Sequence, residues 1–405
     1  MRSRKDPESR CTIRWAAEAC DHRHDAASGA LITYLTCSAL TSINIYCEQP
    51  YTSPDGNRVA ILRRRDMSFD RTWSLLVADL TTLKLSMVEQ DCVCGIGNAA
   101  WSGLILYSCD DSRVRRLNLD SLATEDVLLP SGSVLSDMTV SVSPDQRYVA
   151  LGRIAGTPPA GEIVVIDLET QTERVILQHP ELINPHLQFN PIHGRDILIQ
   201  HNRGSKLAAD GAVESFAGAE GTTHLIISRD GSDHRDLACG PPFTLSSTGH
   251  SNFVADTGRI AWTTHVSTSD SSLDPRYPEG NLFTVGPDDS APTVFAAPEH
   301  RFIHVNVSRC GRYFVSDSRP PSMYGDDGVI HHAALVVGNF ESGKYATLVS
   351  DIGGPSGGGK HTHAHAYLTA DNRNVIYNAP TLSGATQVCA ARVPDGFLQS
   401  LEQLS

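Results

Sequence analysis

The chain has 405 residues, of which 40% are hydrophobic and 20% charged, a composition that is typical of a globular protein and excludes a disordered one. Its formal net charge of -13 argues against nucleic acid as a partner, because phosphate binding needs a basic face. No apolar run is long enough to cross a membrane, and the N-terminal MRSRKDPESR is too polar for a secretory signal. We therefore expect a cytoplasmic protein with no membrane partner.

One pattern recurs along the chain: a short β-rich run, a turn of Asp or Gly type, and a second β-rich run. Its copies are TSPDGNRVAIL (52–62), WSGLILYSCDD (101–111), SVSPDQRYVALG (141–152), QFNPIHGRDILIQH (188–201), NFVADTGRIAWTTH (252–265), NVSRCGRYFVSD (306–317) and YLTADNRNVIYN (367–378). A spacing of roughly 45 to 60 residues is typical of the four-stranded blades of a propeller.

The recurring pattern predicts an all-β protein, and specifically a seven-bladed β-propeller formed by residues 30–405 as a single domain. Turns at Asp-Gly and related pairs would reverse each hairpin, and the alternating apolar residues would be buried between neighbouring blades. Residues 1–29 are expected to form an N-terminal extension. The run ALITYLT (30–36) is expected to supply a strand that closes the ring.

Histidine is frequent, with 17 residues, and several histidines precede the turn of their repeat by a similar short stretch. These are His186, His250, His304, His363 and His365. In a propeller the innermost strands line a central channel, and their ends converge at one mouth. We therefore expect histidines that are distant in sequence to meet there.

The stretch KHTHAHAYLTAD (360–371) carries the strongest indication of a metal site. On a β-strand His363 and His365 would point to the same side, so that two imidazoles could reach one cation. A third imidazole from a neighbouring blade would complete a set suited to manganese, iron or zinc. The alternative is a strand whose histidines are solvated or hydrogen-bonded and bind no metal.

Longer segments around these histidines resemble a known family. They are YCEQPYTSPDG (46–56), GHSNFVADTGRI (249–260), FIHVNVSRCGRYFVSD (302–317) and HTHAHAYLTADNRNVIYNAP (361–380). Through them, most of the chain after about Ala30 resembles the oligogalacturonate lyases. The resemblance implies a seven-bladed propeller that binds a manganese ion in its central cleft and cleaves short pectic oligosaccharides by β-elimination.

The resemblance also implies roles for single residues. The family's histidine ligands match His304, His363 and His365, and its proposed general base matches His250. The family's glutamine ligand falls on Lys360, whose ammonium has no lone pair to offer a metal. His361 or water is the candidate replacement, and Lys360 becomes a candidate partner for a substrate carboxylate.

Two further positions depart from the family. Its catalytic arginine falls on Thr223, so that Arg203, Arg229 or His224 would have to supply charge. Its C-H-E-G-P element is QHNRG (200–204) here, which keeps the histidine but loses the acid and the proline. The candidate catalytic residues besides the base are therefore His201 and Arg203, and the candidate substrate-binding residues besides Lys360 are His186 and His224.

The expected function is β-elimination on uronate-containing oligosaccharides. A divalent ion, Mn²⁺ first among the candidates, would bind the substrate carboxylate while His250 removes the adjacent proton. The expected partner is an acidic oligosaccharide, and the protein is expected to be a monomer or homodimer. Two alternatives stay open: a non-catalytic binding or scaffold propeller, because a fold does not fix a function, and a lyase for a different uronic-acid glycan.

Overall fold

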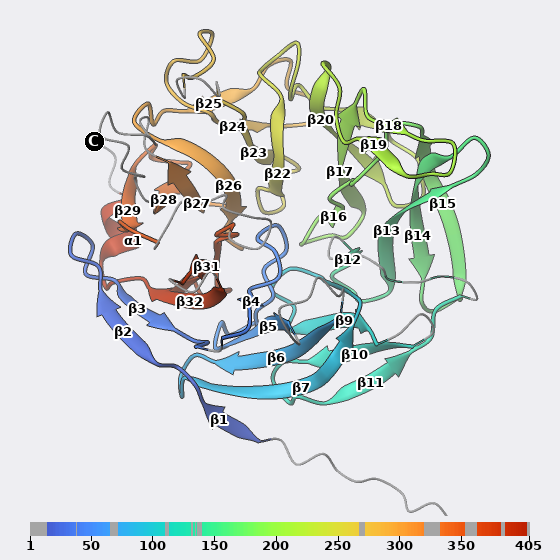
Figure 1. The fold of residues 1–405 in the computed structure, drawn as a ribbon. Helices are drawn as coiled ribbons and strands as arrows, with labels where there is room; N and C mark the ends of the chain where they lie inside the picture. The colour runs from blue at the N-terminus through green and yellow to red at the C-terminus, as the bar shows by residue number, and fades with distance from the viewer. Residues whose placement is uncertain are drawn as a thin grey trace, which may run out of the picture.

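The computed structural model describes residues 14–37, 39–64, 72–109, 113–130, 133, 135, 140–266, 272–319, 333–352, 363–381 and 385–402, without the side chains of 91 and 92. Within these ranges the chain is almost entirely β-structure, and the single helix is α1 (Phe397–Ser400). The sheets stand around a central axis, with β3 from the beginning of the chain beside β32 from its end (Figure 1). No described helix is long and apolar enough to cross a bilayer.

The described strands form one two-stranded sheet and six larger sheets, which follow the chain around the ring. The first has the order β1 (Trp15–Ala17), β7 (Lys84–Val93), β6 (Trp73–Asp79), β5 (Arg58–Arg64) and β4 (Ser42–Ile43). The second has the order β11 (Thr124–Val127), β10 (Val114–Asn118), β9 (Leu104–Ser108), β8 (Gly95–Asn98), β12 (Val140–Val142), β13 (Tyr148–Ala155), β14 (Ala160–Asp167) and β15 (Thr172–His179).

The remaining sheets are four-stranded or five-stranded, apart from the hairpin of β18 (Lys206–Leu207) and β19 (Val213–Ser215). The next two are β16 (Gln188–Phe189), β17 (Asp196–Arg203), β20 (Gly221–Ser228) and β21 (Arg235–Asp236), then β22 (Ser247–Phe253), β23 (Ile260–Thr264), β24 (Leu282–Val285) and β25 (Thr293–Phe295). The last two are β26 (Arg301–Val307), β27 (Tyr313–Arg319), β28 (Ala334–Asn339) and β29 (Tyr345–Val349), then β2 (Asp21–His24), β3 (Leu31–Tyr34), β32 (Thr386–Arg392), β31 (Asn374–Pro380) and β30 (Tyr367–Leu368).

The eight-stranded sheet consists of two four-stranded antiparallel halves that meet at a parallel pairing of β8 with β12. Gly97 lies opposite Val140 in this pairing. A Cβ atom on Gly97 would come within 2.3 Å of the Val140 carbonyl oxygen, so only glycine allows the two inner strands to approach this closely.

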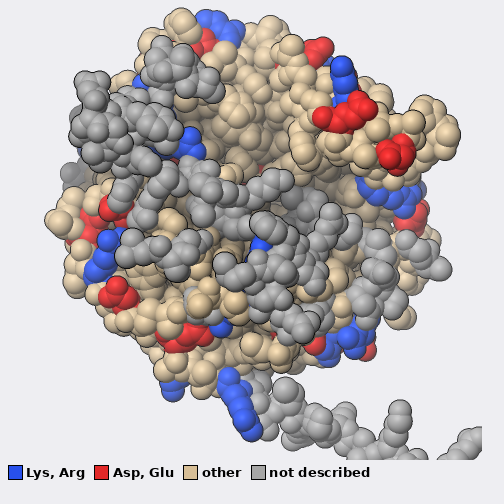
Figure 2. Space-filling view, viewed as in Figure 1, with Lys and Arg blue, Asp and Glu red and all other residues tan. Residues whose placement is uncertain are grey.

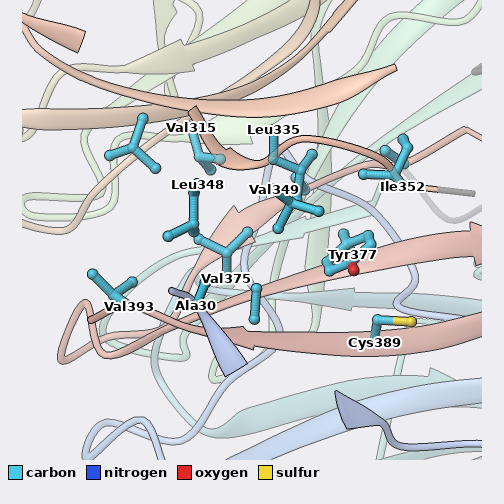
Figure 3. Packing of buried hydrophobic residues seen from close by; sticks show 14 of the residues in the cluster. Ala30, Val315, Leu335, Leu348, Val349, Ile352, Val375, Tyr377, Cys389 and Val393 are labelled. Atoms are coloured by element: carbon cyan, nitrogen blue, oxygen red, sulfur yellow. The ribbon is translucent and has the colours of Figure 1, made fainter. Parts of the chain in front are cut away.

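The ring is closed by pairing the two ends of the chain. Strand β3 runs antiparallel to β32, with Ile32 opposite Ala391, which confirms the closing strand expected from ALITYLT. Apolar side chains from β27, β28, β29, β31 and β32 pack with Ala30 beside this junction (Figure 3). Strands β1 and β2, from the segment predicted as an extension, pair with β7 and β3.

Most strands have both faces covered, as expected for sheets that pack against a neighbour on each side. In β6 the six residues from Trp73 to Ala78 are all buried. Acidic and basic side chains are interspersed around the rim of the face in Figure 2. Ion pairs such as Arg147 with Asp167 (2.7 Å) lie between strands at the outer turns.

Residues 44–50, the channel segment, leave β4 and contact the innermost strands of other sheets. The Cys47 carbonyl accepts a hydrogen bond from Asn306 of β26 (2.9 Å), and the Gln49 amide donates to the carbonyls of Val140 (3.2 Å) and Leu187 (3.3 Å). Ile45 has a φ of 72°, a left-handed conformation that is unusual for a β-branched residue. The segment therefore occupies the centre of the ring and presents its side chains there.

Candidate metal centre

Three of the predicted histidines meet at the centre of the ring. His304 lies in β26, where the register with β27 shifts between Phe302 and Val305, and His363 and His365 lie directly before β30. One ligand nitrogen from each imidazole lies within 4.8 Å of the others. The His304 ring centroid is 4.9 Å from that of His363 and 4.8 Å from that of His365.

The strand alternation expected to aim His363 and His365 at one point is wrong, although the two rings do meet His304. Residues 363–366 form no strand, and His365 has a φ of 41°, so strand alternation does not aim the two rings. Instead, two asparagine side chains hold the backbone: Asn378 Nδ2 donates to the His363 carbonyl (3.0 Å) and Asn44 Nδ2 to the His365 carbonyl (2.7 Å). A left-handed turn, fixed by neighbouring strands, directs the imidazoles.

His304 is prepared as a metal ligand by a buried carboxylate. Its Nδ1–H donates to both Asp317 oxygens at 3.0 Å, and its backbone N–H donates to Oδ1 at 2.8 Å. The side chains are 1% and 0% exposed. Because the proton is held on Nδ1, the lone pair is on Nε2, which is buried with no hydrogen-bond partner among the described residues. A carboxylate, a histidine and an open nitrogen in series fit a bound metal ion.

A second group lies beside the first and is built on the channel segment. The Glu48 carboxylate lies 2.9 Å from His186 Nδ1 and 3.5 Å from His250 Nδ1. His186 Nε2 accepts a hydrogen bond from Asn184 Nδ2 (2.8 Å), so both ring nitrogens of a neutral His186 are engaged. This set satisfies itself and, unlike His304, leaves His186 no lone pair for a metal.

His250, in β22, faces the three histidines of the candidate metal centre. Its ring centroid is 4.2 Å from that of His304, and its side chain is 13% exposed. Burial, followed by the nearby His304, holds the pKa of His250 well below its usual value, although Glu48 acts in the opposite direction. His250 is therefore a neutral imidazole at the edge of the candidate site, the state that a general base needs.

His201, predicted as a catalytic residue, lies with His179 and Glu181 in a separate group. His201 Nε2 lies 3.7 Å from a Glu181 oxygen, and the rings of His179 and His201 are 4.9 Å apart. The Glu181 backbone N–H donates to His179 Nδ1 (3.1 Å). A neutral His179 then carries its proton on Nε2 and has no lone pair left, so this group is not prepared to bind a metal. Arg203, predicted with His201, is exposed at the end of β17.

The other predicted residues take separate places. His224 is 1% exposed in β20, 3.2 Å from the Cys239 sulfur, and burial lowers its pKa to about 3. Thr223 is half-buried and lies opposite His201. Arg229 lies beyond the opposite end of β20, with its guanidinium 4.3 Å from the Tyr148 ring centroid. Lys360 and His361 lie outside the described residues.

The sequence analysis missed several residues that build the site. Tyr46 contacts His250 through its hydroxyl (3.2 Å), and its ring centroid lies 4.4 Å from that of His365. Asp317 and Glu48 were also missed. A signal existed for Asp317, since a carboxylate inside the apolar run YFVSD needs a buried partner, whereas Tyr46 and Glu48 lie in a segment that reads as a loop.

Solved structures share this fold. An oligogalacturonate lyase in complex with manganese is 18% identical, aligns over 95% of this chain and 100% of its own, and has a TM-score of 0.67. The oligogalacturonate lyase of Vibrio parahaemolyticus is 15% identical over 95% of this chain and 98% of its own, also with a TM-score of 0.67. A prolyl endopeptidase is 11% identical over 88% of this chain and 49% of its own, with a TM-score of 0.52.

No protein-family model matches the chain, and no curated protein matches its sequence. At these identities the solved structures show a common fold. The resemblance read from the sequence is thus confirmed at that level: over nearly its whole length, this chain has the fold of the oligogalacturonate lyases.

Proposed function

We propose that the protein is a metal-assisted lyase that cleaves short uronate-containing oligosaccharides by β-elimination, with oligogalacturonate as the first candidate substrate. The observation that supports it most is the His304, His363 and His365 set, in which Asp317 leaves the buried His304 Nε2 open for a metal ion. Neutral His250 beside this set supplies a base. Mn²⁺ is the first candidate ion, because the similar solved lyase holds manganese and imidazole ligands suit it.

The residues at the centre of the ring match the needs of this reaction. The chemistry that a bound divalent ion supplies is dispersal of negative charge on the substrate carboxylate. His250 takes the proton from the carbon next to that carboxylate, the C–H electron pair forms the carbon–carbon double bond, and the bond to the glycosidic oxygen breaks. The oxygen leaves with its electron pair and then takes a proton, and the product is an unsaturated sugar.

The source of positive charge for binding an acidic oligosaccharide differs from that in the similar lyases. Thr223 brings none to the position of the family's arginine. Lys360 is proposed to attract substrate carboxylates and the exposed Arg203 to supply catalytic charge, with His201 as a further catalytic candidate and His186 as a further substrate-binding candidate. His224 is buried and its pKa is about 3, so it is neutral and supplies no charge. His361 stays the candidate replacement for the glutamine ligand of the similar lyases. The formal charge of -13 opposes a long polyanion and favours short oligomers. If Lys360 is a substrate clamp, Lys360→Gln weakens oligomer binding and leaves the metal content unchanged.

The proposed architecture is a seven-bladed propeller with an N-terminal extension. If the two halves of the eight-stranded sheet are separate blades, residues 30–405 would form seven four-stranded blades, and β1 and β2 of the extension 1–29 would be added outer strands. The protein would act as a monomer or homodimer in the cytoplasm. Its partner would be the acidic oligosaccharide.

Two measurements on purified protein test the proposal. Elemental analysis after incubation with Mn²⁺ should find bound metal in the wild type and lose it in His363→Ala/His365→Ala. A matched control, His193→Ala/His234→Ala, removes two exposed histidines that lie outside the candidate site and should keep the metal. Oligogalacturonate and other uronate oligosaccharides should then yield ultraviolet absorbance from the unsaturated product. Absence of both metal and product across the panel would refute the lyase and favour a binding or scaffold protein.

A further inference from the structure

The buried carboxylate of Glu48 is not used by the mechanism above, although it contacts the proposed base. Its side chain is 2% exposed. The channel segment carries it to the centre of the ring, where its backbone carbonyl accepts a hydrogen bond from Asn252 Nδ2 (3.4 Å). A carboxylate in such a place is costly unless its oxygens accept hydrogen bonds. Its partners therefore indicate what it does.

The first partner, His186, fixes the direction of the hydrogen bonds. Asn184 Nδ2 donates to His186 Nε2 (2.8 Å), so the proton of a neutral His186 is on Nδ1 and points at Glu48 Oε1 (2.9 Å). Burial raises the pKa of Glu48, but His186 and His250 outweigh it and the net pKa is lowered. Glu48 is thus an ionised carboxylate, which accepts hydrogen bonds and donates none.

The second partner is His250, whose Nδ1 lies 3.5 Å from the same Glu48 oxygen and 3.2 Å from the Tyr46 hydroxyl. A lone pair on Nδ1 could accept from the Tyr46 hydroxyl, but it would also face the lone pairs of the Glu48 anion. An N–H on Nδ1 is attracted to that anion, and the Tyr46 oxygen can accept from it as well. We propose that Glu48 is a positioning residue that keeps the proton of neutral His250 on Nδ1 and so leaves the Nε2 lone pair for the substrate proton. This inference rests on the proposed function for its consequence in catalysis, though not for the tautomer itself.

The same arrangement explains why the carboxylate comes from the channel segment. Tyr46 and Glu48 alternate there, and the Tyr46 ring lies 4.4 Å from His365, 5.5 Å from His186 and 5.9 Å from His250 between centroids. One short segment thereby sets the base and lies against a metal-binding histidine at once. A carboxylate that fixes the tautomer of a histidine base is known to matter greatly, since its amide replacement leaves the ring in the wrong tautomer.

The direct test is nitrogen-15 NMR of the metal-free protein without substrate. Long-range proton–nitrogen spectra report which imidazole nitrogen carries the proton, and the His250 signals are those missing from His250→Gln. We expect the Nδ1–H tautomer in the wild type and a shift toward Nε2–H in Glu48→Gln, whose amide can donate to Nδ1. An Nε2–H tautomer in the wild type overturns the proposal, as does an unchanged tautomer in folded Glu48→Gln.

Activity supplies the second arm. Glu48→Gln should lower kcat by roughly 10²- to 10⁴-fold, by analogy with tautomer loss in other histidine bases, with little change in KM or in Mn²⁺ content. Tyr46→Phe keeps the carboxylate and should keep the Nδ1–H tautomer. Glu162→Gln, which removes a largely buried carboxylate paired with Arg153 (2.9 Å), is the control and should keep activity. A wild type without lyase activity refutes the proposed function and leaves the NMR result standing, so the two failures are distinguishable.

Discussion

Replacing Asp317 by asparagine tests whether the candidate metal centre works through its buried carboxylate. Asp317 Oδ1 accepts from both the backbone N–H and Nδ1–H of His304, and Oδ2 also accepts from Nδ1–H. In Asp317→Asn the amide oxygen can replace Oδ1 as the acceptor. Its NH₂ group then replaces Oδ2, 3.0 Å from a nitrogen that also carries a proton, and two donors face each other.

The ring can relieve this conflict by moving its proton to Nε2, which removes the lone pair that would bind the metal. Loss of such a carboxylate partner typically weakens metal binding 10- to 100-fold, which corresponds to about 1.4 to 2.7 kcal/mol. Isothermal titration of the metal-free protein with Mn²⁺ measures this change directly. We expect the Mn²⁺ affinity of Asp317→Asn to be 10- to 100-fold lower than that of the wild type. The affinity of His304→Ala should be lower still.

A buried aspartate elsewhere controls for general loss of stability. Asp274 has a 4% exposed side chain and pairs with Arg276 at 2.6 Å. Asp274→Asn should lower the thermal unfolding temperature and leave Mn²⁺ affinity unchanged. The reasoning fails if folded Asp317→Asn binds Mn²⁺ as tightly as the wild type while His304→Ala does not bind it.

Three other outcomes follow from single side chains. Asn378→Ala removes the buried donor to the His363 carbonyl and should destabilise the fold by about 1 to 3 kcal/mol, seen in denaturant unfolding, with weaker Mn²⁺ binding. Burial lowers the pKa of His224 to about 3. The contribution of neutral His224 to stability is therefore complete above pH ~6.5 and is lost as pH falls toward 3. His224→Gln should flatten the slope of unfolding free energy against pH in that window. Burial raises the pKa of Asp25, but hydrogen bonds, first among them the one from the Ser350 N–H, lower it from 3.8 to about 2. The free energy of unfolding lost in Asp25→Asn should therefore be constant near neutral pH and should shrink as pH falls from about 4 toward 2. Denaturant unfolding at each pH measures this loss.

The ring of sheets was predictable because its causes are local. Each hairpin carries its own turn residues and apolar alternation, and the closing strand lies in the apolar run ALITYLT at 30–36. The meeting of His304 with His363 and His365 was predictable for the same reason, since equivalent points in successive repeats reach the same end of the channel. The repeat pattern alone was enough to predict that these histidines lie close together.

The detailed geometry was not predictable, because it depends on contacts between distant parts of the chain. The left-handed turn at His365 exists because Asn44 and Asn378 hold the surrounding carbonyls, and neither asparagine stands out in the sequence. Glu48 is similar: its segment has no strand pattern, and only the closed ring places it against His186 and His250. Spacing alone could indicate which histidines meet, but not which nitrogen of each ring is open.

The path of the channel segment has a consequence for how the protein is made. Glu48 is synthesised among the first residues, His304 much later, and His363 and His365 near the end of the chain, yet all of them belong to one small centre. A nascent chain that has not yet reached His363 therefore lacks two of the three histidines of the candidate metal centre. If the centre binds a metal ion as proposed, binding is expected only after the last sheet has joined the first strands.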